Sequence, residues 1–168
     1  MLSNLYSSSV PAFLQTLNSL SSILTKAATY AETKKIDPSV LINARLAPDM
    51  YPLARQIQTV SDSAKGAAAR LAAVDVPSMP DTETTFAELQ QRIAKTAEFL
   101  KSLKPAQLDG SADREITLNL GGQKVSWKGA IYLTHFVLPN FYFHAATAYD
   151  ILRHNGVEIG KRDFLGSI

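Results

Sequence analysis

Asn140 and His144 are the residues whose types and spacing point most directly to chemistry. They lie four positions apart in HFVLPNFYFHAATAYDILRHNG, the mainly apolar segment from His135 to Gly156. A helix turns about 100° per residue, so both fall on one face. That face also holds Leu133, Val137, Thr147 and Ile151. An amide or imidazole without a partner would be costly on such a stripe, so each side chain needs a hydrogen-bond partner inside the fold.

Asp49 and Gln56 offer matching polar groups in a second helical segment. They are seven positions apart, which is two helical turns, and so share a face. If that face meets the one with Asn140 and His144, a carboxylate, two amides and an imidazole converge. Such a group can bind a divalent metal through Asp49, Asn140 and His144, or it can hold and tune His144 as a catalytic acid or base.

Each of these residues also has a purely structural interpretation. Asp49 can be the N-cap of the second long helix, with a proline tolerated in its first turn. Gln56 can hydrogen-bond to the backbone or to Asp49, and Asn140 can mend the helix next to a proline. His144 can be a core histidine whose hydrogen bonds are satisfied.

The same two segments carry side chains suited to contact a small-molecule substrate. Tyr51 and Arg55 are four apart and form either a surface pair or the rim of a pocket, with Gln56 beside them. Phe141 and Tyr142 would add an aromatic wall. These five residues are the predicted substrate contacts around His144.

Four long helices must position these groups. Apolar residues at helical spacing predict helices over about residues 4–32, 50–74, 86–103 and 128–155, with a short turn of helix near 40–44. Pro11 should either begin the regular part of the first helix or bend it, because proline lacks a backbone donor. Thr85 and Glu88 form a capping-box pattern before the third helix.

A change of hydrophobic period marks a hairpin before the last helix. Ile116, Leu118 and Leu120 alternate with polar residues, and after Gly121-Gly122 the alternation resumes. Alternation broken by two glycines is typical of a β-hairpin.

Composition excludes several classes of function. The 168 residues suit a single domain over 1–168, with 46% hydrophobic and 19% charged residues. The net charge of +2 comes without a Lys/Arg run, so we expect no nucleic-acid partner. Without a signal-type segment or a membrane-length apolar run, we expect no membrane and a cytoplasmic location. Zero cysteines exclude thiolate nucleophiles, cysteine-based zinc sites and disulfides.

The opposite face of the last helix is also aromatic. It carries His135, Tyr142, Phe143 and Tyr149. A helix that is apolar all round is either central or covered by a partner, so a homodimer is predicted. The apolar tail, with Phe164 and Leu165, is expected to dock on the bundle or on a second subunit.

Four motifs carry a resemblance to a known family. They are LAPDMYPLARQIQ at Leu46 to Gln58, FAELQ, the HFVLPNFYFHAATAYDILRHNG segment and EIGKRDFLG near the C-terminus. With them the chain resembles a microbial domain-of-unknown-function family within the DinB-like superfamily of metalloenzymes. The resemblance implies a four-helix bundle with an up-down-down-up course, a long crossover and a homodimer.

The resemblance also implies a modified metal site. In the superfamily, a histidine on the second helix and a His-x-x-x-His pair on the fourth bind a divalent metal, in enzymes that include thiol transferases and an isomerase. Asn140-x-x-x-His144 looks like that pair with its first histidine replaced, and Asp49 or Gln56 occupies the region of the second-helix histidine.

Two functions are therefore expected for this all-α chain. The first is a small-molecule transferase or isomerase centred on His144, which acts as acid/base or as the sole imidazole ligand of a degenerate metal site. The second is a non-catalytic ligand-binding or dimeric scaffold protein that has lost the superfamily metal.

Overall fold

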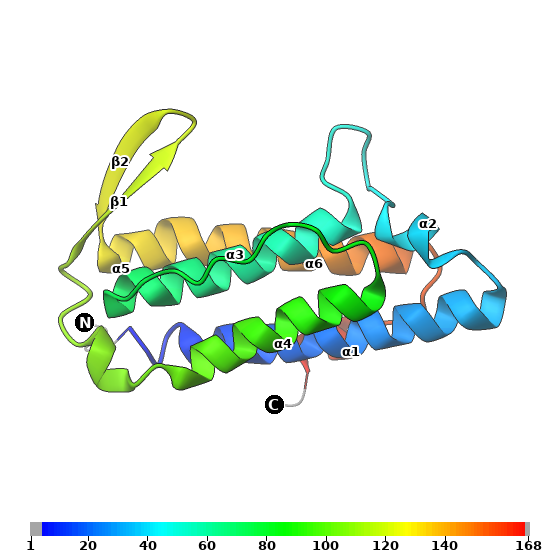
Figure 1. Ribbon diagram of the computed structural model, residues 1–168, viewed down its shortest axis with the longest axis horizontal. Helices are drawn as coiled ribbons and strands as arrows, with labels where there is room; N and C mark the ends of the chain where they lie inside the picture. The colour runs from blue at the N-terminus through cyan, green and yellow to red at the C-terminus, as the bar shows by residue number, and fades with distance from the viewer. Residues whose placement is uncertain (1–4, 167–168) are drawn as a thin grey trace.

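Four long helices dominate the structure, a computed structural model that describes residues 5–166. They are α1 (Val10–Lys34), α3 (Leu53–Ala72), α4 (Phe86–Ser102) and α6 (Leu138–His154). All four lie lengthwise beside one another (Figure 1). Helix α3 packs against both α4 and α6, and α1 packs against α4 and α6 on the other side.

Short elements connect and close these helices. Two strands, β1 (Glu115–Leu120) and β2 (Gln123–Lys128), pair as an antiparallel hairpin. The remaining elements are α2 (Pro38–Ile42), the 3₁₀ turn η1 (Pro105–Leu108), α5 (Gly129–Ile131), the π-helical turn η2 (Tyr132–Val137) and α7 (Lys161–Leu165). The predicted mainly helical fold with a small hairpin before the last helix is confirmed.

Helix α1 starts one residue before its proline. Pro11 lies in the first turn, where the missing N–H needs no intrahelical acceptor, so it begins the regular helix and does not bend it. Residues 5–9 form turns, which makes the predicted start too early; residue 4 itself lies outside the described chain. Lys35 in the left-handed conformation ends the helix.

The start of α3 differs from the prediction for Asp49. The N-cap residue is Pro52, in an extended conformation, and Asp49 lies in an exposed turn before it. The backbone N–H of Leu53 donates to the carbonyl oxygen of Ala44 at 3.0 Å. This backbone bond from the preceding loop satisfies one of the first-turn N–H groups that have no acceptor within the helix. The prediction of Asp49 as N-cap is therefore wrong.

Helix α4 begins as its sequence predicts. The hydroxyl of Thr85 accepts from the N–H of Glu88 at 3.2 Å, and the carboxylate of Glu88 accepts from the N–H of Thr85 at 2.9 Å. Residues 73–85 before it form an extended linker that passes along the outside of the helices from the end of α3 to the start of α4 (Figure 1).

The last predicted helix is divided in two by η2. Pro139 lies in the first turn of α6 and cannot bond the carbonyl of His135, and the widened π-helical turn directly precedes it. In α6 the most buried stripe runs through Phe141, Ala145 and Ala148. Asn140 and His144 are one position away from this stripe and are only half-buried.

The hairpin turns at two glycines in the left-handed region. Gly121 has φ +58° and Gly122 φ +88°, as a two-residue turn between right-twisted strands requires. Trp127 of β2 packs on Tyr132 and Phe136 of η2, with ring centroids 6.0 Å and 5.3 Å away. The hairpin is thereby anchored to the start of the last helix.

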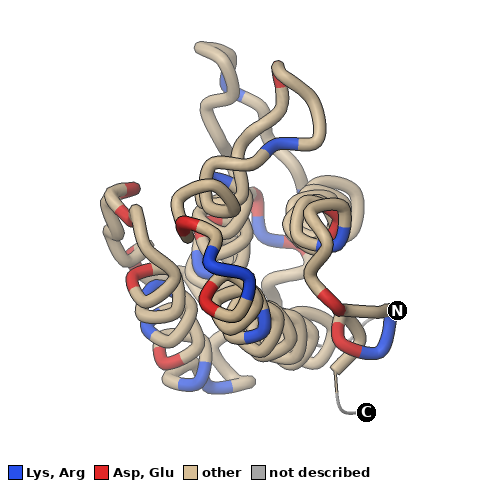
Figure 2. Tube along the Cα trace, turned by 90° about the vertical axis from the view of Figure 1, so that its right-hand side faces the viewer, with Lys and Arg blue, Asp and Glu red and all other residues tan. Residues whose placement is uncertain are grey.

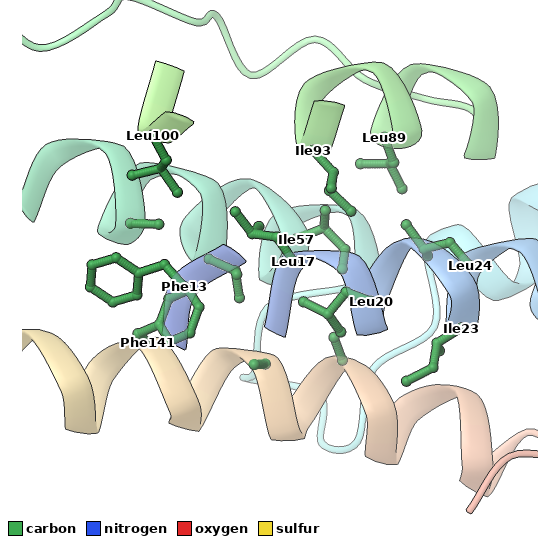
Figure 3. Close-up of a cluster of buried hydrophobic side chains, with 14 of the residues drawn as sticks. Phe13, Leu17, Leu20, Ile23, Leu24, Ile57, Leu89, Ile93, Leu100 and Phe141 are labelled. Atoms are coloured by element: carbon green, nitrogen blue, oxygen red, sulfur yellow. The ribbon is translucent and has the colours of Figure 1, made fainter. Parts of the chain in front are cut away.

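The core lies between the four long helices. Leu17 and Leu20 of α1 belong to one buried cluster with Ile57 of α3 and Ile93 of α4 (Figure 3). Phe13 meets Phe141 of α6 edge to face, with centroids 4.8 Å apart. Alanines make up much of the buried face of α3, so its neighbours can approach closely.

The surface charges are mixed in sign. Basic and acidic positions alternate along the helices in the view of Figure 2, without a continuous basic stripe in that view. No helix within residues 5–166 has the length and hydropathy needed to cross a membrane.

Candidate functional site

A hydrogen bond between α6 and α3 joins two of the predicted site residues. Nδ1 of His144 lies 2.6 Å from Oε1 of Gln56, and Nε2 of Gln56 donates to the carbonyl oxygen of Tyr51 at 3.0 Å. A carbonyl can only accept, so the amide nitrogen of Gln56 must face Tyr51 and its oxygen must face the imidazole. Nδ1 of His144 therefore carries the hydrogen, and in the neutral ring Nε2 carries the lone pair.

Two exposed aromatic rings flank this imidazole. Tyr51 stacks on His144 with centroids 6.2 Å apart and an interplanar angle of 18°, while Phe143 meets it edge-on at 5.2 Å. Tyr51 is 50% exposed and Phe143 57%. The guanidinium carbon of Arg55 lies 5.6 Å from the centroid of the Tyr51 ring. The half-buried His144 thus lies between two aromatic side chains that reach solvent.

Burial and charge both favour the neutral form of this histidine. Partial burial lowers the pKa of His144, and the nearby positive charge of Arg55 lowers it further. Within residues 5–166, Nε2 has no hydrogen-bond partner. At neutral pH the ring offers an available lone pair, which can accept a proton or bind a metal.

The predicted metal ligands do not form a set that fits a divalent cation. Asn140 donates from Nδ2 to the hydroxyl of Ser63 at 2.9 Å, and the exposed side chain of Asp49 forms no hydrogen bond or ion pair within residues 5–166. The described chain has no group of three or more His, Cys, Asp and Glu side chains that could hold a metal. A site with His144 as its one imidazole would need ligands that these contacts do not supply.

The aromatic residues predicted as a substrate wall separate into two environments. Phe141 is fully buried against Phe13, so its ring belongs to the core between α1 and α6. Tyr142 is partly exposed and touches Phe141 edge-on. Phe143, which the prediction assigned to a dimer face, is the aromatic residue of α6 that contacts His144. Its proximity to the imidazole follows from their adjacency on the helix.

Comparison with known proteins places the chain in a family. The model of a domain of unknown function, DUF1993, matches residues 5–165, almost the whole chain. The chain belongs to the DUF1993 family. The chain is 42% identical in sequence to a DinB family member from Shewanella denitrificans. The two structures, one of them that protein's crystal structure, superpose with a TM-score of 0.91. That match covers 98% of this chain and 93% of the other. No curated protein matches the chain.

This DUF1993 member also has a buried ion-pair cluster that the sequence analysis missed. Arg92 of α4, with a side chain 1% exposed, pairs with Asp62 of α3 at 2.7 Å and with Asp81 and Glu83 of the linker at 2.9 Å and 3.0 Å. Asp81 also pairs with Arg55. In the sequence, the acidic residues after the prolines of the linker were the available signal for this cluster. Their basic partners are on two separate helices, so the sequence did not show which residues pair.

Proposed function

We propose that this DUF1993 protein is a small-molecule enzyme that uses Nε2 of His144 as a general base. The proposal is carried by one observation, the relay from the Tyr51 carbonyl through Gln56 to Nδ1 of His144, which leaves the lone pair on Nε2. The lowered pKa of His144 supports it, because a base must be unprotonated at working pH.

The chemistry follows from the tautomer. Nε2 would take a proton from a bound substrate, and the resulting imidazolium would keep its Nδ1–H bond to the oxygen of Gln56. Return of the proton to another atom of the substrate is an isomerisation, and removal of a proton from an attacking thiol starts a transfer. The likeness to DinB-like proteins favours these two reactions over hydrolysis. The proposal includes no metal step, because the ligand set does not fit.

Tyr51, Arg55 and Phe143 are proposed to contact the substrate. Tyr51 and Phe143 offer apolar ring surface on two sides of the imidazole, and Arg55 offers a positive charge above Tyr51. Planar or partly apolar substrates with a polar group suit this arrangement. Gln56 is then a positioning residue, since it acts through His144.

Three broader assignments belong to the same proposal. The linker of residues 73–85 supports an up-down-down-up course for the four long helices, as in DinB-like bundles. The exposed rings of Tyr142 and Phe143 support a homodimer. A cytoplasmic location stays a prediction from the sequence. The alternative function is ligand binding or scaffolding without catalysis, which the exposed aromatic surface beside His144 would also serve.

An exchange experiment tests the proposed base directly. The protein is incubated in deuterated water with a panel of small ketones, keto acids and thiol adducts, and loss of carbon-bound hydrogen is followed by proton NMR. We expect catalysed exchange for at least one compound, and His144→Asn should reduce it about 100-fold or more. Asparagine retains a donor near the Nδ1 position, so the bond to Gln56 can persist while the base is lost.

His135→Asn is the matched control for this experiment. His135 lies in η2 and is exposed, and its Nδ1 is 3.2 Å from the hydroxyl of Thr134, away from the Gln56 relay. This variant should retain full exchange activity. If His144→Asn exchanges the compounds as fast as the wild type, the general-base role fails and the ligand-binding alternative is preferred.

A further inference from the structure

A second site, separate from the Gln56–His144 pair, lies where the hairpin meets α3 and η2. A cavity of about 170 Å³ opens there, lined by Ser63 and Arg70 of α3, Leu118 of β1, Tyr132 and Phe136 of η2, and Asn140 of α6. We propose that this cavity binds a small carboxylate through the guanidinium of Arg70. The inference does not involve His144 and stands apart from the proposed enzyme activity.

Arg70 is a cation without a carboxylate partner. Its Nη1 donates to the hydroxyl of Tyr132 at 3.3 Å, and no Asp or Glu within residues 5–166 lies at ion-pair distance from it. A guanidinium presents five N–H donors in a planar fork that matches the two oxygens of a carboxylate. Most of these donors are therefore available to a ligand in the cavity.

Gly66 leaves room for the guanidinium of Arg70 beside the backbone of α3. A Cβ atom at Gly66 would lie 2.5 Å from Nη1 of Arg70 and would displace the guanidinium. Glycine in a helix interior lowers helix stability, so a buried one needs a reason. Here the missing side chain allows the guanidinium of Arg70 to fold back along α3 toward the cavity.

Asp62 also lines the cavity, and its negative charge would oppose an anionic ligand. That charge is already paired, because its Oδ1 lies 2.9 Å from Nζ of Lys65 and 2.7 Å from Nη2 of Arg92. The unmatched charge of the lining is the positive one on Arg70.

Two hydroxyl groups complement the guanidinium. Tyr132 is 2% exposed, and burial raises the pKa of its hydroxyl, which therefore stays protonated. This oxygen accepts from Arg70, and its own hydrogen has no acceptor within the described residues. The hydroxyl oxygen of Ser63 accepts a hydrogen bond from Asn140, and the hydroxyl hydrogen of Ser63 also has no acceptor within the described residues. Both can donate to a ligand oxygen.

The size and the apolar wall define the ligand class. Leu118, Phe136 and Val137 add apolar surface to the lining beside the polar groups. The volume is below the range of about 300–1,000 Å³ that is usual for drug-sized ligands, so a ligand with few heavy atoms fits. A short-chain or compact aromatic carboxylic acid meets these conditions. The π-helical turn that supplies Tyr132 and Phe136 is a feature frequently found at functional sites.

The test compares carboxylates with their uncharged amides. Acetate, propionate and benzoate, with propionamide and benzamide as neutral counterparts, are titrated into the full-length protein while amide chemical shifts are followed by NMR. We expect at least one carboxylate to bind at least about tenfold more tightly than its amide, with shifts centred on α3, η2 and β1. Arg70→Gln should abolish the difference.

Arg153→Gln is the control, because it removes the same charge from an exposed position of α6. Gly66→Ala should weaken carboxylate binding by displacing the guanidinium, and far-UV circular dichroism checks that each variant is folded. Should Gly66→Ala fail to fold, Arg70→Gln on the half-exposed side of α3 still decides the matter. Failure of every carboxylate to bind the wild type, equal binding of acid and amide, or undiminished binding by Arg70→Gln would overturn the proposal.

Discussion

At the scale of single residues, the position of one hydrogen on His144 determines what the site can do. Gln56 cannot turn its amide without losing its bond to the carbonyl of Tyr51, so it keeps the hydrogen on Nδ1 and the lone pair on Nε2. The sequence placed Gln56 and His144 on two apolar stripes and left open whether the two faces meet or whether Gln56 bonds to the backbone; in the structure Gln56 does both. The sequence also left open which partner Asn140 would take, because a shift of one residue in the buried stripe of α6 directs that amide to Ser63.

The titration of His144 should show both causes of its lowered pKa. We expect the pKa of His144, from proton NMR of its ring, to lie below the ordinary value of about 6.5. Arg55→Gln should move it part of the way back, since burial is the larger cause and remains. Arg153→Gln removes an exposed positive charge nine positions further along α6 and should leave the pKa of His144 unchanged, because only Arg55 among the charged residues lowers it. An ordinary pKa in the wild type would contradict the proposed environment.

The same shift predicts how stability depends on pH. The unfolded state binds a proton at His144 more readily than the folded state, so the contribution of this residue is fully present above the unfolded pKa and is lost as pH falls through the folded pKa. Between about pH 7 and pH 5, the free energy of unfolding should therefore fall more steeply for the wild type than for His144→Asn. Urea unfolding at several pH values measures both slopes. If the free energy of unfolding changes equally with pH in both proteins, protonation of His144 is not coupled to stability.

At the scale of elements, the features formed by neighbours in the chain could be predicted from the sequence. The contacts between distant segments could not. The capping box of Thr85 and Glu88 and the glycine turn at 121–122 are formed by neighbours in the chain, so sequence spacing is sufficient. The π-helical turn at 132–137 directly precedes Pro139 and packs against Trp127, and of these two features only the proline is visible as a signal in the sequence. The ion pairs of Arg92 join α4, α3 and the linker, and no hydrophobic periodicity in the sequence predicts them.

Removal of Arg92 should destabilise the protein strongly. Arg92→Met would leave Asp62, Asp81 and Glu83 without their shared partner, in positions that are only partly shielded from water. Loss of one partner of a buried ion pair costs about 3–5 kcal/mol, and partial exposure of these carboxylates places the expectation at about 3 kcal/mol. Urea unfolding measures it. Lys95→Met, an exposed cation one turn later in α4, should change stability by less than about 0.5 kcal/mol. Equal effects would show that the cluster contributes little.

At the scale of the whole molecule, the last helix has a different environment on each side. Phe141 and Ala145 face the core, and Tyr149 packs on Phe164 of α7 at 5.9 Å, so the C-terminal tail covers part of the predicted dimer face. Tyr142 and Phe143 stay exposed on the same helix. The family and the mainly helical fold were predictable from motifs and periodicity. The division of the aromatic face between the tail and solvent was not, because it depends on where α7 docks.

The remaining exposed rings lead to a test of the homodimer. If Tyr142 and Phe143 lie in an interface, Phe143→Arg buries an unpaired charge there and should shift sedimentation from dimer to monomer, because an unpaired buried charge is costly. Val40→Arg adds the same charge at an equally exposed apolar position on α2 and should leave the assembly unchanged. Analytical ultracentrifugation over a range of concentrations distinguishes these outcomes. A wild type that sediments as a monomer at every concentration would contradict the homodimer and leave the aromatic surface around His144 open to ligands alone.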